Sequence, residues 1–173
     1  MEIMKTLILF SSKYDTTRDC AVELKNYLSG QVDLVNVKNM KKLSPENYDR
    51  IIIGAPVYKG IIDKGIRAFT ENNRDSLKNK DYGLFMCCMS QGARVEEQFN
   101  NNFSKEILNG AKVKENFGGK FKFSRMSFIE KKMIIMISKK EPSLGVVDGK
   151  RDIDKVNHQN IIKFAKAICG ESR

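Results

Sequence analysis

Apolar segments alternate with helical patterns along the chain. The segments Thr6 to Phe10 and Arg50 to Gly54 are apolar at successive positions, without polar residues in alternation. Strands that are apolar on both faces are typical of the interior of a parallel sheet. We therefore predict strands in these two segments. Three further strands are predicted at 32–37, 82–89 and 113–121.

Helical patterns follow these strands. Ala21 and Leu24 repeat at helical spacing after the first strand, which predicts a helix there. Further helices are predicted near 64–72, 95–103 and 152–169. Asp152 and Asp154 suit the first turn of the last helix, because acidic side chains stabilise a helix N-terminus. Five strands alternating with helices predict a doubly wound α/β sheet, with residues 1–173 forming a single domain.

The predicted topology brings three loops to one end of the sheet. Right-handed crossovers place the loops after strands one, three and four there, and such folds bind ligands at that end. The first loop lacks the glycines of dinucleotide and nucleoside triphosphate sites. It offers hydroxyl side chains and the N–H groups of a helix N-terminus, which suit one terminal phosphate without a metal. These hydroxyls are Ser11, Ser12, Thr16 and Thr17. The alternative is that Thr16 or Thr17 only caps the helix.

Charge adds a candidate surface to this picture. The 173 residues include 31 Lys and Arg against 21 Asp and Glu, a net charge of +10. Residues 111–151 hold eleven of the basic and four of the acidic residues, so this segment alone carries +7. Such a patch attracts polyanions, anionic membrane surfaces or acidic small molecules. The alternative is a solvated basic face without a partner.

The cysteines indicate a reducing compartment. The chain has four cysteines, and no two of them form a C-x-x-C pair: Cys20, Cys87, Cys88 and Cys169. His158 is the single histidine. Neither a zinc site nor a disulfide framework is therefore expected. No apolar run is long enough for a signal peptide or a membrane-spanning helix. We therefore expect a cytoplasmic protein.

Several segments resemble a known family. Lys5 to Ser11, Glu46 to Ala55 and Phe117 to Gly119 are similar to flavodoxin-domain proteins. The resemblance covers nearly the whole chain. It is closest to the menaquinone-dependent protoporphyrinogen oxidase group and to related clostridial-type flavodoxins. It implies a flavodoxin-like five-stranded parallel sheet of order 2-1-3-4-5, with FMN as cofactor.

The resemblance also implies where FMN binds. The family loop [TS]-x-T-G-x-T wraps the FMN phosphate, and this chain matches it at Ser12 and Thr17. Asp15 replaces the family glycine, so Asp15→Gly is expected to tighten FMN binding by removing a like charge. The isoalloxazine ring is expected between the second and third loops, where Tyr58 either stacks on it or is a packed tyrosine. The implied cofactor-binding residues are Ser11, Ser12, Lys13, Tyr14, Asp15, Thr16, Thr17, Ala55, Pro56, Val57, Tyr58, Lys59, Gly60, Met89, Ser90, Gln91 and Gly92.

A helical insertion of about 123–150 separates the fifth strand from the last helix. It is longer than a connection requires. Ser127 and Glu130 have the spacing of a capping box, and lysine pairs flank the apolar helix that they open. We expect the segment from Ser127 to Lys140 to lie on an anionic membrane surface or to close over a lipophilic substrate. The alternative is a helix packed on the core with its lysines outward.

The sequence therefore predicts an FMN-binding redox protein. It contains no Ser-His-Asp set, activated cysteine or paired carboxylates, so the flavin would carry the chemistry and no catalytic side chain is predicted. The basic insertion favours an oxidoreductase like the oxidase group, with a redox partner or quinone, at the inner face of the membrane. No nucleic acid partner is expected. The alternatives are a flavodoxin electron carrier between a reductase and a partner enzyme, and an FMN-free interaction module.

Overall fold

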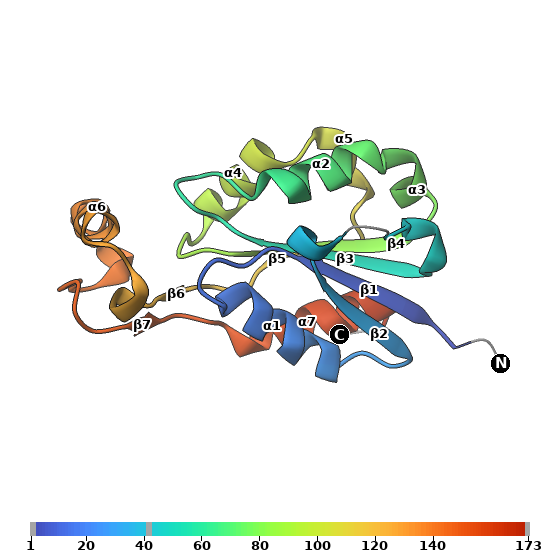
Figure 1. Ribbon diagram of the computed structural model, residues 1–173, viewed down its shortest axis with the longest axis horizontal. Coiled ribbons are helices and arrows are strands. Elements are labelled where there is room, and N and C mark those ends of the chain that lie inside the picture. The colour runs from blue at the N-terminus through green and yellow to red at the C-terminus, as the bar shows by residue number, and fades with distance from the viewer. Residues whose placement is uncertain (1–2, 41–42, 172–173) are drawn as a thin grey trace.

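A parallel sheet of five strands forms the centre of the molecule. The computed structural model describes residues 3–40 and 43–171. The strand order is β2-β1-β3-β4-β5, which confirms the predicted sheet (Figure 1). All four pairings are parallel. The strands are β1 (Lys5–Phe10), β2 (Gln31–Asn36), β3 (Arg50–Pro56), β4 (Asp81–Cys87) and β5 (Val113–Asn116).

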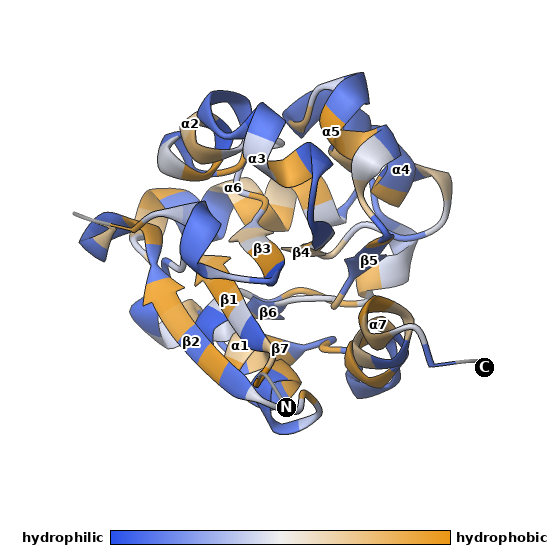
Figure 2. Ribbon diagram, turned by 90° about the vertical axis from the view of Figure 1, so that its right-hand side faces the viewer, coloured by the Kyte–Doolittle hydropathy of each residue, from blue (hydrophilic) through white to orange (hydrophobic). Residues whose placement is uncertain are grey.

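Helices cover both faces of this sheet, as Figures 1 and 2 show. One face packs against α2 (Lys64–Asn72), α3 (Arg74–Lys78), α4 (Ala93–Asn102) and α5 (Lys105–Gly110). The other face packs against α1 (Thr16–Asn26) and α7 (His158–Cys169). Short 3-10 helices are η1 (Val37–Asn39), η2 (Pro45–Asn47), η3 (Phe123–Arg125) and η4 (Pro142–Leu144). No helix in the described ranges is long and apolar enough to cross a bilayer.

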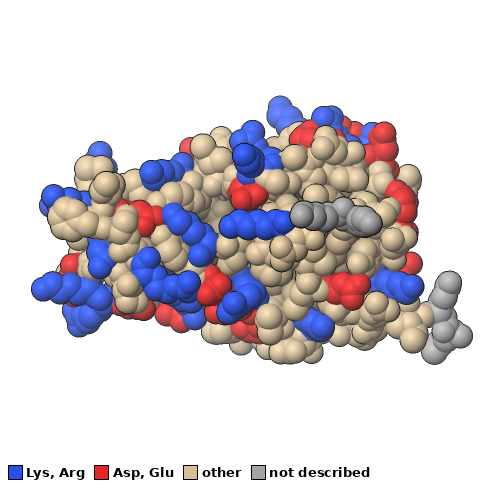
Figure 3. Space-filling model, viewed as in Figure 1, with Lys and Arg blue, Asp and Glu red and all other residues tan. Residues whose placement is uncertain are grey.

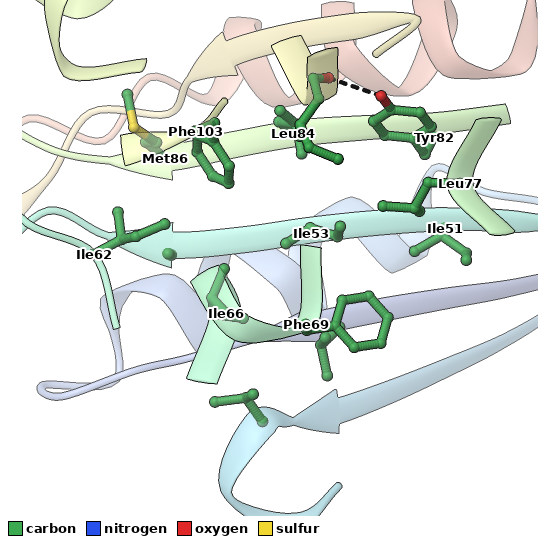
Figure 4. Packing of buried hydrophobic residues seen from close by; sticks show 14 of the residues in the cluster. Ile51, Ile53, Ile62, Ile66, Phe69, Leu77, Tyr82, Leu84, Met86 and Phe103 are labelled. Atoms are coloured by element: carbon green, nitrogen blue, oxygen red, sulfur yellow. Dashed lines mark hydrogen bonds between the residues drawn. The ribbon is translucent and has the colours of Figure 1, made fainter. Parts of the chain in front are cut away.

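Two apolar clusters fill the space between the sheet and its helices. Ile51, Ile52 and Ile53 of β3 are fully buried, as expected for a strand that is apolar on both faces. In the first cluster the buried hydroxyl of Tyr82 donates to the Ile107 carbonyl at 2.7 Å (Figure 4). In the second cluster three phenylalanine rings pack with centroids 4.5 to 6.1 Å apart, those of Phe85, Phe117 and Phe164.

The structure corrects the prediction for the last helix. Helix α7 begins at His158, and Asp152 and Asp154 lie before it rather than in its first turn. Ile153–Asp154 forms strand β7, which pairs antiparallel with β6 (Lys120–Phe121). The Asp154 carboxylate accepts a hydrogen bond from Val156 N at 3.0 Å, and this bond stabilises the non-helical segment between β7 and α7. The predicted fifth strand likewise ends early, at Asn116, and β6 is a separate short strand.

The insertion projects beyond the carboxyl ends of the parallel strands (Figure 1). The β6–β7 ribbon forms its base, and helix α6 (Phe128–Ser138) is its main element. The Ser127 hydroxyl accepts from Glu130 N, and a Glu130 carboxylate oxygen accepts from Ser127 N at 2.9 Å, so the predicted capping box is confirmed. Gly118 begins the turn into this insertion with φ of 76°, where a Cβ would lie 1.9 Å from the Lys155 carbonyl oxygen. Only glycine fits so close an approach.

Candidate functional site

The loop after β1 contains buried hydroxyl groups that have no hydrogen-bond partner among the described residues. They are the hydroxyls of Ser11, Ser12, Thr16 and Thr17. Burying a hydroxyl without a partner costs about 1 to 3 kcal/mol, so four neighbouring cases indicate a site that an anion would complete. The N-cap residue of α1 is Asp15, and neither Thr16 nor Thr17 occupies that position. The arrangement therefore favours the phosphate site over the helix-capping alternative.

Asp15 adopts the left-handed backbone conformation, with φ of 66°. This is the conformation that the family glycine would favour. Its carboxylate pairs with Arg125 of the insertion at 2.7 Å and with Arg18 at 3.3 Å. The Arg125 hydrogen bond holds the pKa of Asp15 below its usual value. We expected Asp15→Gly to tighten FMN binding because a free carboxylate would repel the phosphate. In the structure this carboxylate is paired, so the substitution would also remove the contact with Arg125.

The second loop forms a tight turn after β3. Tyr58 and Ile61 exchange backbone hydrogen bonds of 3.0 and 3.1 Å. Lys59 and Gly60 between them both have positive φ, at 54° and 78°, as a two-residue turn of this hand requires. Val57 N donates to the Cys87 carbonyl at 3.1 Å, which fixes this loop beside the end of β4.

Asn116 holds the third loop. Its side-chain oxygen accepts from Cys88 N, and its amide nitrogen donates to the carbonyls of Cys88 and Ser90, each at 3.1 Å. Sequence reasoning missed this residue. A polar residue at the end of the fifth strand was the available signal, but its partners lie 26 to 28 positions earlier in the chain.

A cavity of about 190 Å³ lies where the three loops meet the insertion. Ten of the predicted residues line it: Ser12, Lys13, Tyr14, Thr16, Thr17, Pro56, Val57, Tyr58, Lys59 and Met89. The insertion and the ribbon below it supply an apolar wall whose residues were not among the predicted site residues: Phe121, Met126, Met133, Ile134 and Ile137.

The other predicted residues lie around this cavity. Ser11 lines a neighbouring cavity together with Ser12 and Lys13. Ser90, Gln91 and Gly92 line a polar cavity on the side of β5 and α7, together with Asn116 and Asn160. Asp15, Ala55 and Gly60 line none of these three cavities. Ala55 is instead buried in the core at the end of β3.

One carboxylate joins the insertion to these loops. Glu130 Oε1 accepts from Lys13 Nζ at 2.6 Å, from the Tyr14 hydroxyl at 2.7 Å and from the Tyr58 hydroxyl at 2.6 Å. The Lys13 bond, followed by the Tyr58 bond, holds the pKa of Glu130 far below its usual value. The pKa of Lys13 is raised in turn by Glu130. Burial and then the Glu130 bond raise the pKa values of both tyrosines.

These pKa shifts favour the ordinary neutral-pH protonation state of each group in the cluster. The Glu130 carboxylate is ionised, the Lys13 ammonium is charged, and both tyrosine hydroxyls keep their protons. Lys13 Nζ also lies 4.1 Å from the centre of the Tyr58 ring, a cation–π contact. The site therefore combines a loop of buried hydroxyls that lack partners among the described residues, an apolar wall and a tyrosine whose ring is held in place.

The chain is similar to known proteins along most of its length. A model of the flavodoxin domain matches residues 7–143. The protoporphyrinogen IX dehydrogenase [quinone] of Escherichia coli K12 is 25% identical over 176 aligned residues, which cover 96% of this chain and 95% of that protein. The flavodoxin-like domain-containing protein BilS of Clostridioides difficile strain CD3 is 30% identical over 132 residues, covering 69% and 73% of the two chains.

Solved structures agree with this assignment of the fold. A short-chain flavodoxin associated with a bacterial microcompartment superposes with a TM-score of 0.58 at 11% identity, covering 97% of this chain and 98% of that one. Oxidised flavodoxin 1 of Bacillus cereus gives a TM-score of 0.50 at 12% identity, covering 98% and 99%. The predicted flavodoxin-like architecture is therefore confirmed.

Proposed function

Because the chain belongs to the flavodoxin domain family, we propose that it binds one FMN at the carboxyl end of its sheet and passes electrons through it. The observation that carries this proposal is the set of unpartnered hydroxyls in the first loop. A phosphate group offers the charged acceptors that these buried donors lack. The N-terminus of α1 adds a favourable field for an anion.

The residues present fit FMN in two parts. Ser12, Thr16 and Thr17 would hold the phosphate. The second and third loops, with Tyr58, would hold the isoalloxazine ring. Bound flavin supplies electron transfer in one- or two-electron steps, and the protein tunes its electronics through neighbouring groups. The apolar wall of the insertion would exclude water from the ring.

We propose further that the protein is an oxidoreductase rather than a carrier. Its similarity to the E. coli dehydrogenase runs along 96% of the chain and so includes the insertion. The insertion supplies Met126, Met133 and Ile134 to the cavity wall, which suits a lipophilic redox partner such as a quinone.

The oxidoreductase proposal is tested by giving the purified protein protoporphyrinogen as the electron donor and a quinone as the electron acceptor. We expect oxidation of the porphyrinogen that depends on added FMN. A protein that leaves protoporphyrinogen untouched, yet cycles its flavin with a ferredoxin-type or flavin reductase, would instead be an electron carrier.

The phosphate assignment predicts the effect of Thr17→Ala. The variant should weaken FMN binding by about 1.5 to 3 kcal/mol, the worth of a hydrogen bond to a charged group, while riboflavin, which lacks the phosphate, should bind as before. Flavin fluorescence titration measures both affinities.

A matched control is Thr6→Ala. Thr6 also has a buried hydroxyl without a partner among the described residues, but it lies at the opposite end of β1. It should leave FMN affinity unchanged. Equal losses for FMN and riboflavin in Thr17→Ala would show that this loop does not hold the phosphate.

We also propose that α6 meets an anionic membrane surface. Phe128, Ile129 and Met136 are 69%, 77% and 62% exposed, whereas Ile134 is buried and faces the cavity. Basic side chains gather at this end of the molecule (Figure 3). Exposed apolar residues beside lysines are typical of helices that lie in a membrane interface. This arrangement would place the mouth of the site near lipophilic partners and the protein at the inner face of the membrane.

Charge removal tests the membrane proposal. Changing Lys131, Lys132, Lys139 and Lys140 to Gln should abolish co-sedimentation with anionic vesicles and leave FMN binding intact, since each surface lysine contributes about 1 kcal/mol. High salt should release the wild-type protein. The control changes four exposed lysines of α1, α5 and α7 to Gln: Lys25, Lys105, Lys163 and Lys166. If both quadruple variants lose vesicle binding equally, net charge and not α6 is responsible.

A further inference from the structure

Glu130 connects three segments that are distant in sequence. It is the third residue of α6, and its partners Tyr14 and Tyr58 lie 116 and 72 positions earlier. Its side chain is only 14% exposed, whereas that of its ionic partner Lys13 is 49% exposed. Lys13, Tyr14 and Tyr58 all line the cavity. The side chains of two flavin-site loops are thus held by a single carboxylate oxygen of the insertion.

Two further ion pairs attach the insertion to the core, one at the first loop and one at the helix after the third loop. Arg125, just before α6, binds Asp15 in the phosphate loop. Glu141, just after α6, pairs with Arg94 in the first turn of α4, which follows the third loop. Besides Glu130, which forms the polar contact of α6 with the site, α6 lines the cavity with the apolar residues Met133, Ile134 and Ile137. Helix α6 therefore lies against the site and is flanked at both of its ends by ion pairs to the core.

We propose that Glu130 is a positioning residue that holds the insertion closed over the flavin site, so that FMN enters and leaves only when the Glu130 bonds break. This inference rests on the proposed binding of FMN. Hydrogen bonds between charged groups are the strongest of the polar contacts, and here one carboxylate oxygen receives three donors, one of them charged. The Glu130 cluster therefore controls opening, while the apolar wall and the hydroxyl loop determine affinity.

Glu130→Gln isolates this role from helix capping. Glutamine at the third helical position also completes a capping box, so α6 should still form, but the ionic partner of Lys13 is lost. If Glu130 closes the site both with and without FMN, the rate constants for FMN association and dissociation should each rise about tenfold, and their ratio should stay nearly constant. Stopped-flow quenching of flavin fluorescence measures both rates.

Asp148→Asn is the matched control. It removes the same charge from the insertion, but its hydrogen bonds stay within its own turn, to Lys150 N at 2.8 Å and Arg151 N at 3.0 Å. It should keep wild-type rates. The inference is overturned if Glu130→Gln also keeps wild-type rates. It is equally overturned if only dissociation accelerates, because Glu130 would then support affinity and not opening.

Proteolysis of the protein without flavin tests the same contact independently. Trypsin cleaves after the lysines of the insertion, and cleavage requires local opening. Glu130→Gln should be cut within 125–150 about tenfold faster than wild type and Asp148→Asn, and unchanged cutting overturns the inference. Tyr14→Phe with Tyr58→Phe, which removes two donors and leaves α6 intact, should change cutting in the same direction. A wild-type protein that binds no FMN would refute the proposed function, while the proteolysis would still decide whether Glu130 holds the insertion.

Discussion

The parallel pairing of β1, β3 and β4 is the constraint on which the rest of the site depends. Phe10 pairs with Gly54, and Pro56 pairs with Cys87, so the three strands end side by side. Ser11 N then donates to the Gly54 carbonyl at 3.1 Å, and Val57 N to that of Cys87. These backbone bonds set where each loop leaves the sheet. Because the strands are buried on both faces, a shift in register by one residue would move Ile52 from one apolar cluster into the other and disrupt the close packing on both faces, so the core fixes the loop positions.

The few acidic residues of the basic segment 111–151 all have polar partners. The four acidic residues of the basic segment all accept hydrogen bonds or pair with cations: Glu115, Glu130, Glu141 and Asp148. Two of them bind cationic residues of the core: Glu130 binds Lys13, and Glu141 binds Arg94. Glu130 and Glu141 thus attach the insertion to the core, while many of its lysines stay exposed to solvent. One segment can in this way be both the cover of a site and a basic outer surface.

The sequence predicted the sheet and the loops well because their determinants are local. Successive apolar residues such as Ile51 to Ile53 indicate buried strands, and the loops follow from where those strands end. The start of α7 was predicted wrongly because acidic residues before a helix resemble a first turn. The decisive signal was Asn157, whose side chain accepts from Asn160 N at 3.1 Å and caps the helix.

The contacts within the site were less predictable. Glu130 already had a sufficient local role in the capping box, so nothing in the sequence pointed to Tyr14 or Tyr58. Arg125 and Asp15 lie 110 positions apart, and their pairing follows only from how the insertion folds back. The apolar wall was foreseen as a helix that closes over a lipophilic group, but which of its residues face inward could be determined only once α6 was placed against the loops.

If the proposed function is right, three core loops and the insertion form one flavin site. Hydrogen–deuterium exchange of the wild-type protein with and without FMN tests this most directly. FMN should slow amide exchange in 11–17, 55–60 and 89–92, and in Phe128–Ser138 to a similar degree, because α6 covers the same cavity. Protection that is confined to the loops, with α6 exchanging as before, would contradict the account.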